Sequence, residues 1–156
     1  WLIYPDTIYT KKLSRRGIRI AQDLEINVLK TRYVGEVMTR EVEAIPQDVP
    51  LRAVRDRILE TGHQGFPLVD EEGRLVGIIT GQDVMEAIKR DKDLPAFAVA
   101  QRNLIVAYPD ETLDLVWERM GQHDIGRLPV VAREDPRRLV GFLTKGDLIR
   151  FRRTAG

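Results

Sequence analysis

The chain has 156 residues, of which 43% are hydrophobic and 31% charged, and its formal net charge is +1. This composition is typical of a folded globular protein, and it argues against disorder and against a strong overall attraction to nucleic acid. The absence of cysteine excludes disulfides, thiolate catalysis and cysteine-ligated metal sites. With only two histidines and no long apolar run, neither a metal site nor a membrane span is expected.

Basic residues are concentrated at the start of the sequence. Residues 1–33 carry seven basic and three acidic residues, whereas residues 34–156 carry 18 basic and 21 acidic residues. The first segment is either a solvated linker or an arm near anionic lipid headgroups, where each basic residue contributes about 1 kcal/mol. Its first five residues, 1–5, are rich in aromatic side chains of the kind found at membrane edges. No secretory signal is recognised, so an intracellular setting is expected.

The remainder of the sequence is an internal duplication, with copies at about 34–88 and 96–151. Pro67 and Pro129 are 62 residues apart, and the later Gly77 and Gly141 are 64 apart. The two additional residues fall in a turn of the second copy, where insertions cost little. Because each copy of about 55 residues is near the lower limit for burying its own core, the copies are expected to pack against each other.

Each copy predicts a strand, a helix, two strands and a second helix. Apolar residues spaced i, i+3 and i+7 indicate the first helix, and apolar runs around a polar turn indicate a hairpin. In the first copy these are a strand at 42–45, a helix with Leu51, Val54 and Ile58 that ends at Gly62, a hairpin of 66–69 and 75–79, and a helix at 83–89. In the second copy they are a strand at 104–106, a helix with Leu113, Val116 and Met120 that ends at Gly121, a hairpin that starts at 128, and a helix at 147–152. This tandem β-α-β-β-α order predicts an α+β fold with a pseudo-twofold pair of repeats.

Both copies contain Gly-x-x-Thr-x-x-Asp where the hairpin ends and the last helix begins. Thr80 with Asp83, and Thr144 with Asp147, have the spacing of a helix capping box. The same geometry also suits a ligand, because a helix N-terminus attracts phosphate and a carboxylate accepts hydrogen bonds from a ribose diol. Lys145 adds a cation beside the second copy. The motif therefore predicts a cap, a nucleoside phosphate site, or both.

The doubled motif and the tandem β-α-β-β-α pattern resemble a pair of CBS domains, also called a Bateman module. The resemblance covers about residues 34–153. It implies two packed repeats with clefts that bind adenosine-containing ligands, dimerisation, regulation of an attached protein, and no catalysis.

Residues 6–17 resemble the linker that leaves the last membrane helix of chloride channels and chloride/proton exchangers. The turn at 63–67 is similar to a Gly-Phe-Pro turn in that family. On this interpretation, residues 1–33 are the linker from a membrane-embedded transport domain of the same chain, 34–93 the first CBS repeat and 94–156 the second. The module would lie on the cytoplasmic face of a membrane and modulate ion transport.

The CBS resemblance implies two nucleotide sites, with no cofactor or metal required. The first would bind ATP, ADP or AMP through residues of both repeats: Thr39, Val42, His63, Gln64, Gly65, Phe66, Thr144, Lys145 and Asp147. A second, pseudo-symmetric site would use Thr80, Gln82, Asp83, Gln101, Leu104 and Arg127.

Several of these assignments have plain structural alternatives. His63 lines the adenine or is an exposed helix-end residue, and Arg127 contacts phosphate or forms a surface salt bridge. Trp117 belongs to the core or a dimer interface, or it stacks on a ligand. The whole module is a nucleotide-binding regulator of a chloride transporter, a nucleotide-free dimerisation module, or the regulatory domain of another transporter or enzyme. Neither an enzymatic site nor nucleic-acid binding is expected.

Overall fold

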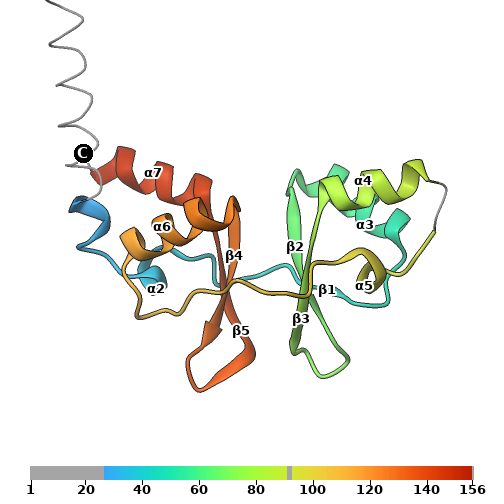
Figure 1. The fold of residues 1–156 in the computed structure, drawn as a ribbon, viewed down its shortest axis with the longest axis horizontal. Coiled ribbons are helices and arrows are strands. Elements are labelled where there is room, and N and C mark those ends of the chain that lie inside the picture. The colour runs from blue at the N-terminus through green and yellow to red at the C-terminus, as the bar shows by residue number, and fades with distance from the viewer. Residues whose placement is uncertain (1–26, 91–92, 156) are drawn as a thin grey trace, which may run out of the picture.

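The computed structural model describes residues 27–90 and 93–155, which form two lobes lying side by side (Figure 1). The first lobe contains β1 (Ile45–Pro46), α3 (Leu51–Thr61), β2 (Gly65–Val69), β3 (Leu75–Thr80), α4 (Gly81–Lys89) and α5 (Ala96–Val99). The second lobe contains α2 (Val34–Val37), α6 (Leu113–His123), β4 (Arg127–Ala132), β5 (Asp135–Thr144) and α7 (Lys145–Ala155). The α+β duplication predicted from the sequence is therefore confirmed.

Each lobe is built on one antiparallel hairpin. In the first lobe β2 pairs with β3, and β1 adds a parallel strand along β2. In the second lobe β4 pairs with β5, and a single parallel bridge between Ala107 and Val130 takes the place of the strand predicted at 104–106. The pairing register of β4 and β5 shifts at Val131, which accommodates the additional residues of this copy in an irregular hairpin.

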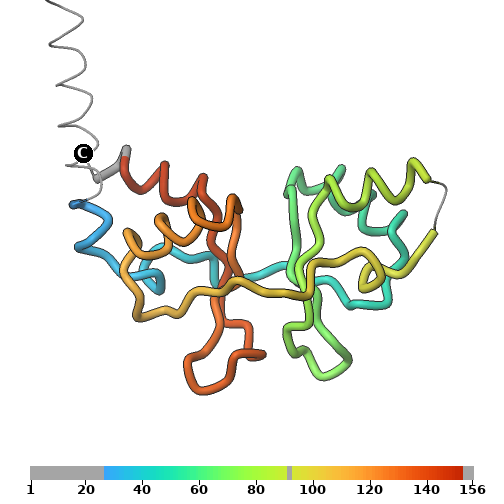
Figure 2. Tube along the Cα trace, in the orientation of Figure 1, coloured from blue at the N-terminus to red at the C-terminus, as the bar shows by residue number. Residues whose placement is uncertain are grey.

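The strand predicted at 42–45 is reduced to β1, which begins at Ile45, and no strand forms at 104–106, because these segments cross between the lobes. Figure 2 shows both crossing segments. Thr39 forms an antiparallel bridge with Phe142 of the second lobe, and Gln101 forms the equivalent bridge with Ile78 of the first. Backbone groups at the start of each crossing segment therefore hydrogen-bond to the long strand of a hairpin, Thr39 to β5 and Gln101 to β3. The first segment enters the sheet of the first lobe only at Ile45, where β1 begins.

The two long amphipathic helices, α3 and α6, match the apolar spacing of the sequence. Their predicted stripes are buried in the two cores. Gly62 ends α3 in the left-handed conformation with φ 74°, as predicted. The predicted end of α6 at Gly121 is wrong, because the helix continues to His123 and Asp124 takes the left-handed role with φ 51°. Aspartate tolerates this conformation better than most non-glycine residues do.

The short helices α2 and α5 each pack on the lobe of the other repeat. Leu29, Val34 and Met38 lie in the core of the second lobe, whereas Ala96 lies in the core of the first. Backbone hydrogen bonds fix the exchange, since Val34 N donates to Glu111 O at 2.8 Å and Ala96 N donates to Val49 O at 2.8 Å. The lobes are thus joined by exchanged segments. Within the described residues, no helix has the length and apolarity needed to cross a membrane.

Candidate functional site

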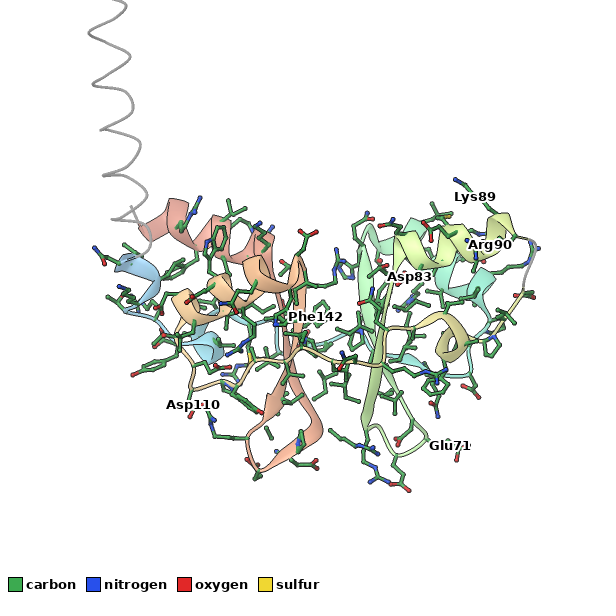
Figure 3. The ribbon with its side chains drawn as sticks, viewed as in Figure 1. Glu71, Asp83, Lys89, Arg90, Asp110 and Phe142 are labelled. Atoms are coloured by element: carbon green, nitrogen blue, oxygen red, sulfur yellow. The ribbon has the colours of Figure 1, made fainter. Side chains whose placement is uncertain are left out.

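A cleft of about 470 Å³, here called the first cleft, lies between the lobes. It is formed by the crossing segment after α2, the start of β2, and the junction of β5 and α7. Its lining residues are Thr39, Glu41, Val42, Glu43, Gly62, His63, Gln64, Gly65, Phe66, Pro67, Arg127, Phe142, Thr144, Asp147 and Arg150. Phe142 lies where the two lobes meet (Figure 3). All but one of the predicted first-site residues line this cleft.

The exception is Lys145, which the CBS resemblance assigned to the first site. Lys145 is exposed, and its Nζ lies 5.2 Å from the ring centroid of Trp117. Trp117 itself is partly buried and packs against the core of the second lobe, with Arg152 also over its ring. The ammonium group therefore interacts with an aromatic face on the surface of α6 and does not line the cleft.

The Thr-x-x-Asp motif at the start of α7 has the hydrogen bonds of a cap. Thr144 N donates to Asp147 Oδ2 at 2.9 Å, and Asp147 N donates to Thr144 Oγ1 at 3.1 Å. The other carboxylate oxygen, Oδ1, forms an ion pair with Arg150. The cap and the candidate ligand site therefore use the same carboxylate, since Asp147 also lines the cleft. Arg150 was missed from the sequence, although it follows Asp147 at i+3, a spacing that places two side chains side by side on a helix.

The opposite wall of the first cleft is aromatic and acidic. The rings of His63 and Phe66 have centroids 5.9 Å apart. Nδ1 of His63 lies 3.4 Å from Oε2 of Glu43, and Arg57 of α3 forms an ion pair with the same carboxylate. The imidazole is exposed, so its face is open to a ligand while its position is constrained by Glu43.

A second cleft of about 310 Å³ lies at the pseudo-symmetric position. Its lining residues include all six predicted ones, which are Thr80, Gln82, Asp83, Gln101, Leu104 and Arg127. The sequence analysis missed six further lining residues: Ile78, Asn103, Ile105, Asp124, Ile125 and Gly126. The start of α4 is a complete capping box, because Asp83 N donates to Thr80 Oγ1 at 3.3 Å and Thr80 N donates to Asp83 Oδ2 at 3.2 Å.

Arg127 is half-buried and lines both clefts. Burial lowers the pKa of its guanidinium, and the nearby negative charge of Asp83 partly opposes this effect. Among the described residues no carboxylate lies within ion-pair distance of Arg127, so the alternative of a surface salt bridge is not observed. A partly desolvated cation that faces two cavities is suited to an anionic ligand group.

The described residues contain no group of three or more potential metal ligands. The clefts instead combine apolar walls, a carboxylate at a helix start and guanidinium groups. Such a set can hold a planar base, a diol and an anion.

The model of the CBS domain family matches residues 34–90 and again 96–154. This chain belongs to the CBS domain family. Its two repeats form a tandem CBS pair, which is a regulatory type of module.

Known proteins similar to this CBS pair include enzymes and ligand-bound domains. Homoserine O-acetyltransferase of Methanohalobium evestigatum is 28% identical over 124 residues, which are 80% of this chain and 25% of that protein. L-aspartate semialdehyde sulfurtransferase of Methanocaldococcus jannaschii is 42% identical over 85 residues, which are 54% of this chain and 16% of that protein. The chain thus spans a quarter or less of these two relatives.

Among solved structures, the CBS domain pair of protein MJ0100 is similar with a TM-score of 0.73 and 28% identity. The match covers 80% of this chain and 98% of that chain, which was solved in complex with 5′-methylthioadenosine and S-adenosyl-L-methionine. Both of those ligands contain adenosine.

Proposed function

We propose that this CBS pair is a regulatory module whose first cleft binds an adenine nucleotide (ATP, ADP or AMP) or a related adenosine compound. The observation that carries the proposal is the convergence of Asp147, at the start of α7, with the His63–Phe66 wall of the other repeat in one cavity. The carboxylate would accept hydrogen bonds from the ribose diol. The exposed imidazole, which packs against the buried Phe66 ring, would cover one face of the adenine.

The first cleft is the stronger candidate for the filled site. Its volume of about 470 Å³ exceeds the 310 Å³ of the second cleft. Small-molecule sites typically start at about 300 Å³, so the second cleft is close to that lower limit. The adenosine ligands of the MJ0100 domain pair support the base and ribose as the recognised parts.

Arg127 and Arg150 support a preference for ligands with a phosphate group. Both guanidinium groups line the first cleft. Arg150 already interacts with Asp147, so a phosphate would compete with that carboxylate or join it in a shared network. Guanidinium groups bind phosphate bidentately, which adds geometric selectivity.

Binding would act on the attached protein through the crossing segment. Thr39, Glu41 and Glu43 belong to the stretch between α2 and β1, and they line the first cleft. A ligand in the cleft would therefore bias the position of α2 on the second lobe. Regulation then requires only that the ligand has different affinities for two arrangements of the lobes.

The identity of the regulated domain is a separate proposal. The resemblance to chloride channel and exchanger linkers lies at 6–17, outside the described residues. We retain a membrane transport domain of the same chain as the proposed partner, which would put the module on the cytoplasmic face. The enzyme relatives above support the alternative of a regulated enzyme. The coding sequence that precedes Trp1 decides between them, since the transporter proposal requires several apolar helices there.

A nucleotide-free dimerisation module is a second candidate. Leu59 on α3 is 71% exposed and Met85 on α4 is 37% exposed. Apolar side chains on the helices of a lobe are typical of a surface that contacts a partner. Sedimentation at micromolar concentration would detect a homodimer, and a monomer would contradict this assembly.

Replacement of Asp147 tests the nucleotide proposal directly. In Asp147→Asn the amide oxygen can still cap α7, but the charge that would hold the ribose is lost. We expect AMP binding to weaken by about 10- to 100-fold in calorimetric titration, since a charge-assisted hydrogen bond contributes about 1.5–3 kcal/mol. The melting temperature without ligand should change little.

Asp83→Asn makes the equivalent change in the second cleft and is the matched control. It should change the AMP affinity of the tighter binding step by no more than about twofold. If neither heat nor a melting shift is seen for the unaltered protein with AMP, ADP, ATP or S-adenosyl-L-methionine, the proposal is wrong and the dimerisation module is favoured.

A further inference from the structure

Gly65 and Arg127 occupy equivalent positions in the two repeats, 62 residues apart. Each begins the first strand of its hairpin, and each pairs with the threonine of its own motif, Gly65 with Thr80 and Arg127 with Thr144. The repeats therefore differ at this position by a whole side chain. The strand pairing is the same in both repeats.

The missing side chain at Gly65 makes room for the side chain of Arg127. A Cβ added at Gly65 would lie 2.7 Å from Cδ and 3.0 Å from Nε of Arg127. The arginine thus crosses from the second lobe over the backbone of the first. This crossing is why one guanidinium lines both the first and the second cleft.

The second cleft depends on this group for positive charge. Among its described lining residues Arg127 is the only cation, and Asp83 and Asp124 are acidic. In the first cleft the other guanidinium, that of Arg150, is engaged with Asp147. An anion in either cleft would therefore use Arg127.

We infer that the shared Arg127 couples the two clefts, so that an anionic nucleotide bound in one cleft weakens the binding of an anionic nucleotide in the other. This inference rests on the proposed function. The first phosphate neutralises the one shared cation. A second phosphate in the second cleft would then meet Asp83 and Asp124 with no other cation among the described lining residues, and one in the first cleft would find only Arg150, which is already paired with Asp147. A neutral ligand such as adenosine does not need the guanidinium, so its two binding steps stay independent.

The test compares AMP with adenosine in proteins with one intact cleft. Asp147→Asn leaves the second cleft intact and Asp83→Asn leaves the first. In the unaltered protein, the second AMP should bind at least 10-fold more weakly than AMP binds the remaining cleft of Asp147→Asn. For adenosine, the affinity of the second binding step in the unaltered protein and the affinity of the remaining cleft in Asp147→Asn should agree within about twofold. Calorimetric titration measures all four affinities.

Replacement of the shared residue should act on both clefts. Arg127→Gln should weaken AMP binding by at least 10-fold in each of the two proteins with one intact cleft. It should change the affinity for adenosine by no more than about twofold. Lys89→Ala is the charge control, because Lys89 lies at the outer end of α4, away from the clefts (Figure 3), and it should change neither ligand. Gly65→Ala is a second variant that keeps the charge but displaces the Arg127 side chain, and it should reduce the AMP coupling.

The outcomes separate the two proposals. If adenosine and AMP both bind the unaltered protein, but Arg127→Gln changes AMP affinity in one cleft alone, or weakens adenosine as much as AMP, the coupling is wrong and the nucleotide site stands. Equal AMP affinities in the two binding steps also overturn the coupling. If neither compound binds, both proposals are wrong.

Discussion

The first cleft presents His63 where the second presents Ile125, and Gly65 where the second presents Arg127. The two clefts nevertheless share one backbone plan, because the threonine and aspartate at each helix start occupy equivalent places. Both clefts also take one wall from a crossing segment that is bridged to the opposite hairpin. The repeated threonine and aspartate cap the helices and also line the clefts, whereas the residues that differ line the clefts and have no part in the caps. The duplication thus preserves what the fold requires and leaves the clefts free to differ in ligand chemistry.

The two lobes also differ in how deeply their ion pairs are buried, and removal of the more buried pair, in the second lobe, has the largest expected effect on stability. Arg119 of α6 forms a two-bond pair with Glu111 at 2.6 and 2.8 Å and donates to Val106 O at 2.9 Å. Only 11% of the Glu111 side chain is exposed. We expect Glu111→Ala to lower the free energy of unfolding by about 2–3 kcal/mol, because it leaves a partly buried guanidinium without its partner. Urea denaturation at pH 7 measures the loss.

The same pair makes stability depend on pH. The side-chain hydrogen bonds from Arg119, more than any other cause, hold the pKa of Glu111 below its usual value. Because the pKa of Glu111 is lower in the folded than in the unfolded protein, its ionised carboxylate stabilises the fold at neutral pH. This stabilisation is lost as the pH falls through about 4 and below. The difference between the unaltered protein and Glu111→Ala should therefore shrink at pH 3. A difference that is the same at pH 7 and pH 3 would contradict this account.

Glu43 is the comparison for Glu111 in the first lobe. Its partner Arg57 occupies the position equivalent to Arg119, but this pair is about twice as exposed, at 50% for Arg57 and 24% for Glu43 against 27% for Arg119 and 11% for Glu111. Because water screens an ion pair whose arginine is exposed, and such pairs contribute about 0–1 kcal/mol, Glu43→Ala should change the unfolding free energy by about 1 kcal/mol or less. A loss as large as that of Glu111→Ala would remove the contrast between the lobes.

The glycines under the two crossing segments give a second, smaller contrast. A Cβ at Gly141 would lie 2.4 Å from Sδ of the buried Met38 and 3.1 Å from the Thr39 carbonyl oxygen. At Gly77 the nearest atoms are the Gln101 carbonyl oxygen at 3.1 Å and Cβ of Ala100 at 3.4 Å. We expect Gly141→Ala to destabilise by about 1–3 kcal/mol through overpacking, and Gly77→Ala by less. Thermal unfolding of both variants checks the order, and the reverse order would show that Met38 moves freely.

The smallest expected effect concerns the ring in the first cleft. His63→Ile gives this cleft the residue of the second cleft, and adenosine should bind about 2- to 10-fold more weakly because a stacking contact contributes about 0.5–1.5 kcal/mol. Ile125→His is the reciprocal variant and should strengthen adenosine binding in the second cleft. Unchanged affinities in fluorescence or calorimetric titrations would assign His63 to a structural role at the end of α3.

The sequence was sufficient for the features that depend on local pattern. The spacing of Leu51, Val54 and Ile58 predicted α3, and the paired Thr-x-x-Asp motifs predicted the caps of α4 and α7. The CBS resemblance placed all but Lys145 of the predicted first-site residues, and all six predicted second-site residues, in the cleft linings, although it missed several further lining residues.

The features that were missed depend on contacts between distant parts of the chain. Nothing local shows that Lys145 lies over Trp117 or that Arg127 crosses to the other lobe. The exchange of α2 and α5 was also missed, since an apolar helical turn such as Val34–Val37 fits either core. Arg150 was the one missed cation with a local signal, its i+3 spacing from Asp147.

The exchange of α2 and α5 means that the unit of sequence and the unit of folding do not coincide. A protein cut between the repeats would give two fragments, each lacking part of its own interior, so they should become stable only when mixed. A domain joined ahead of Leu29 would be tethered to the second lobe, although the sequence places it next to the first repeat. A signal passed along the chain would then reach the distant half of the module before the adjacent one.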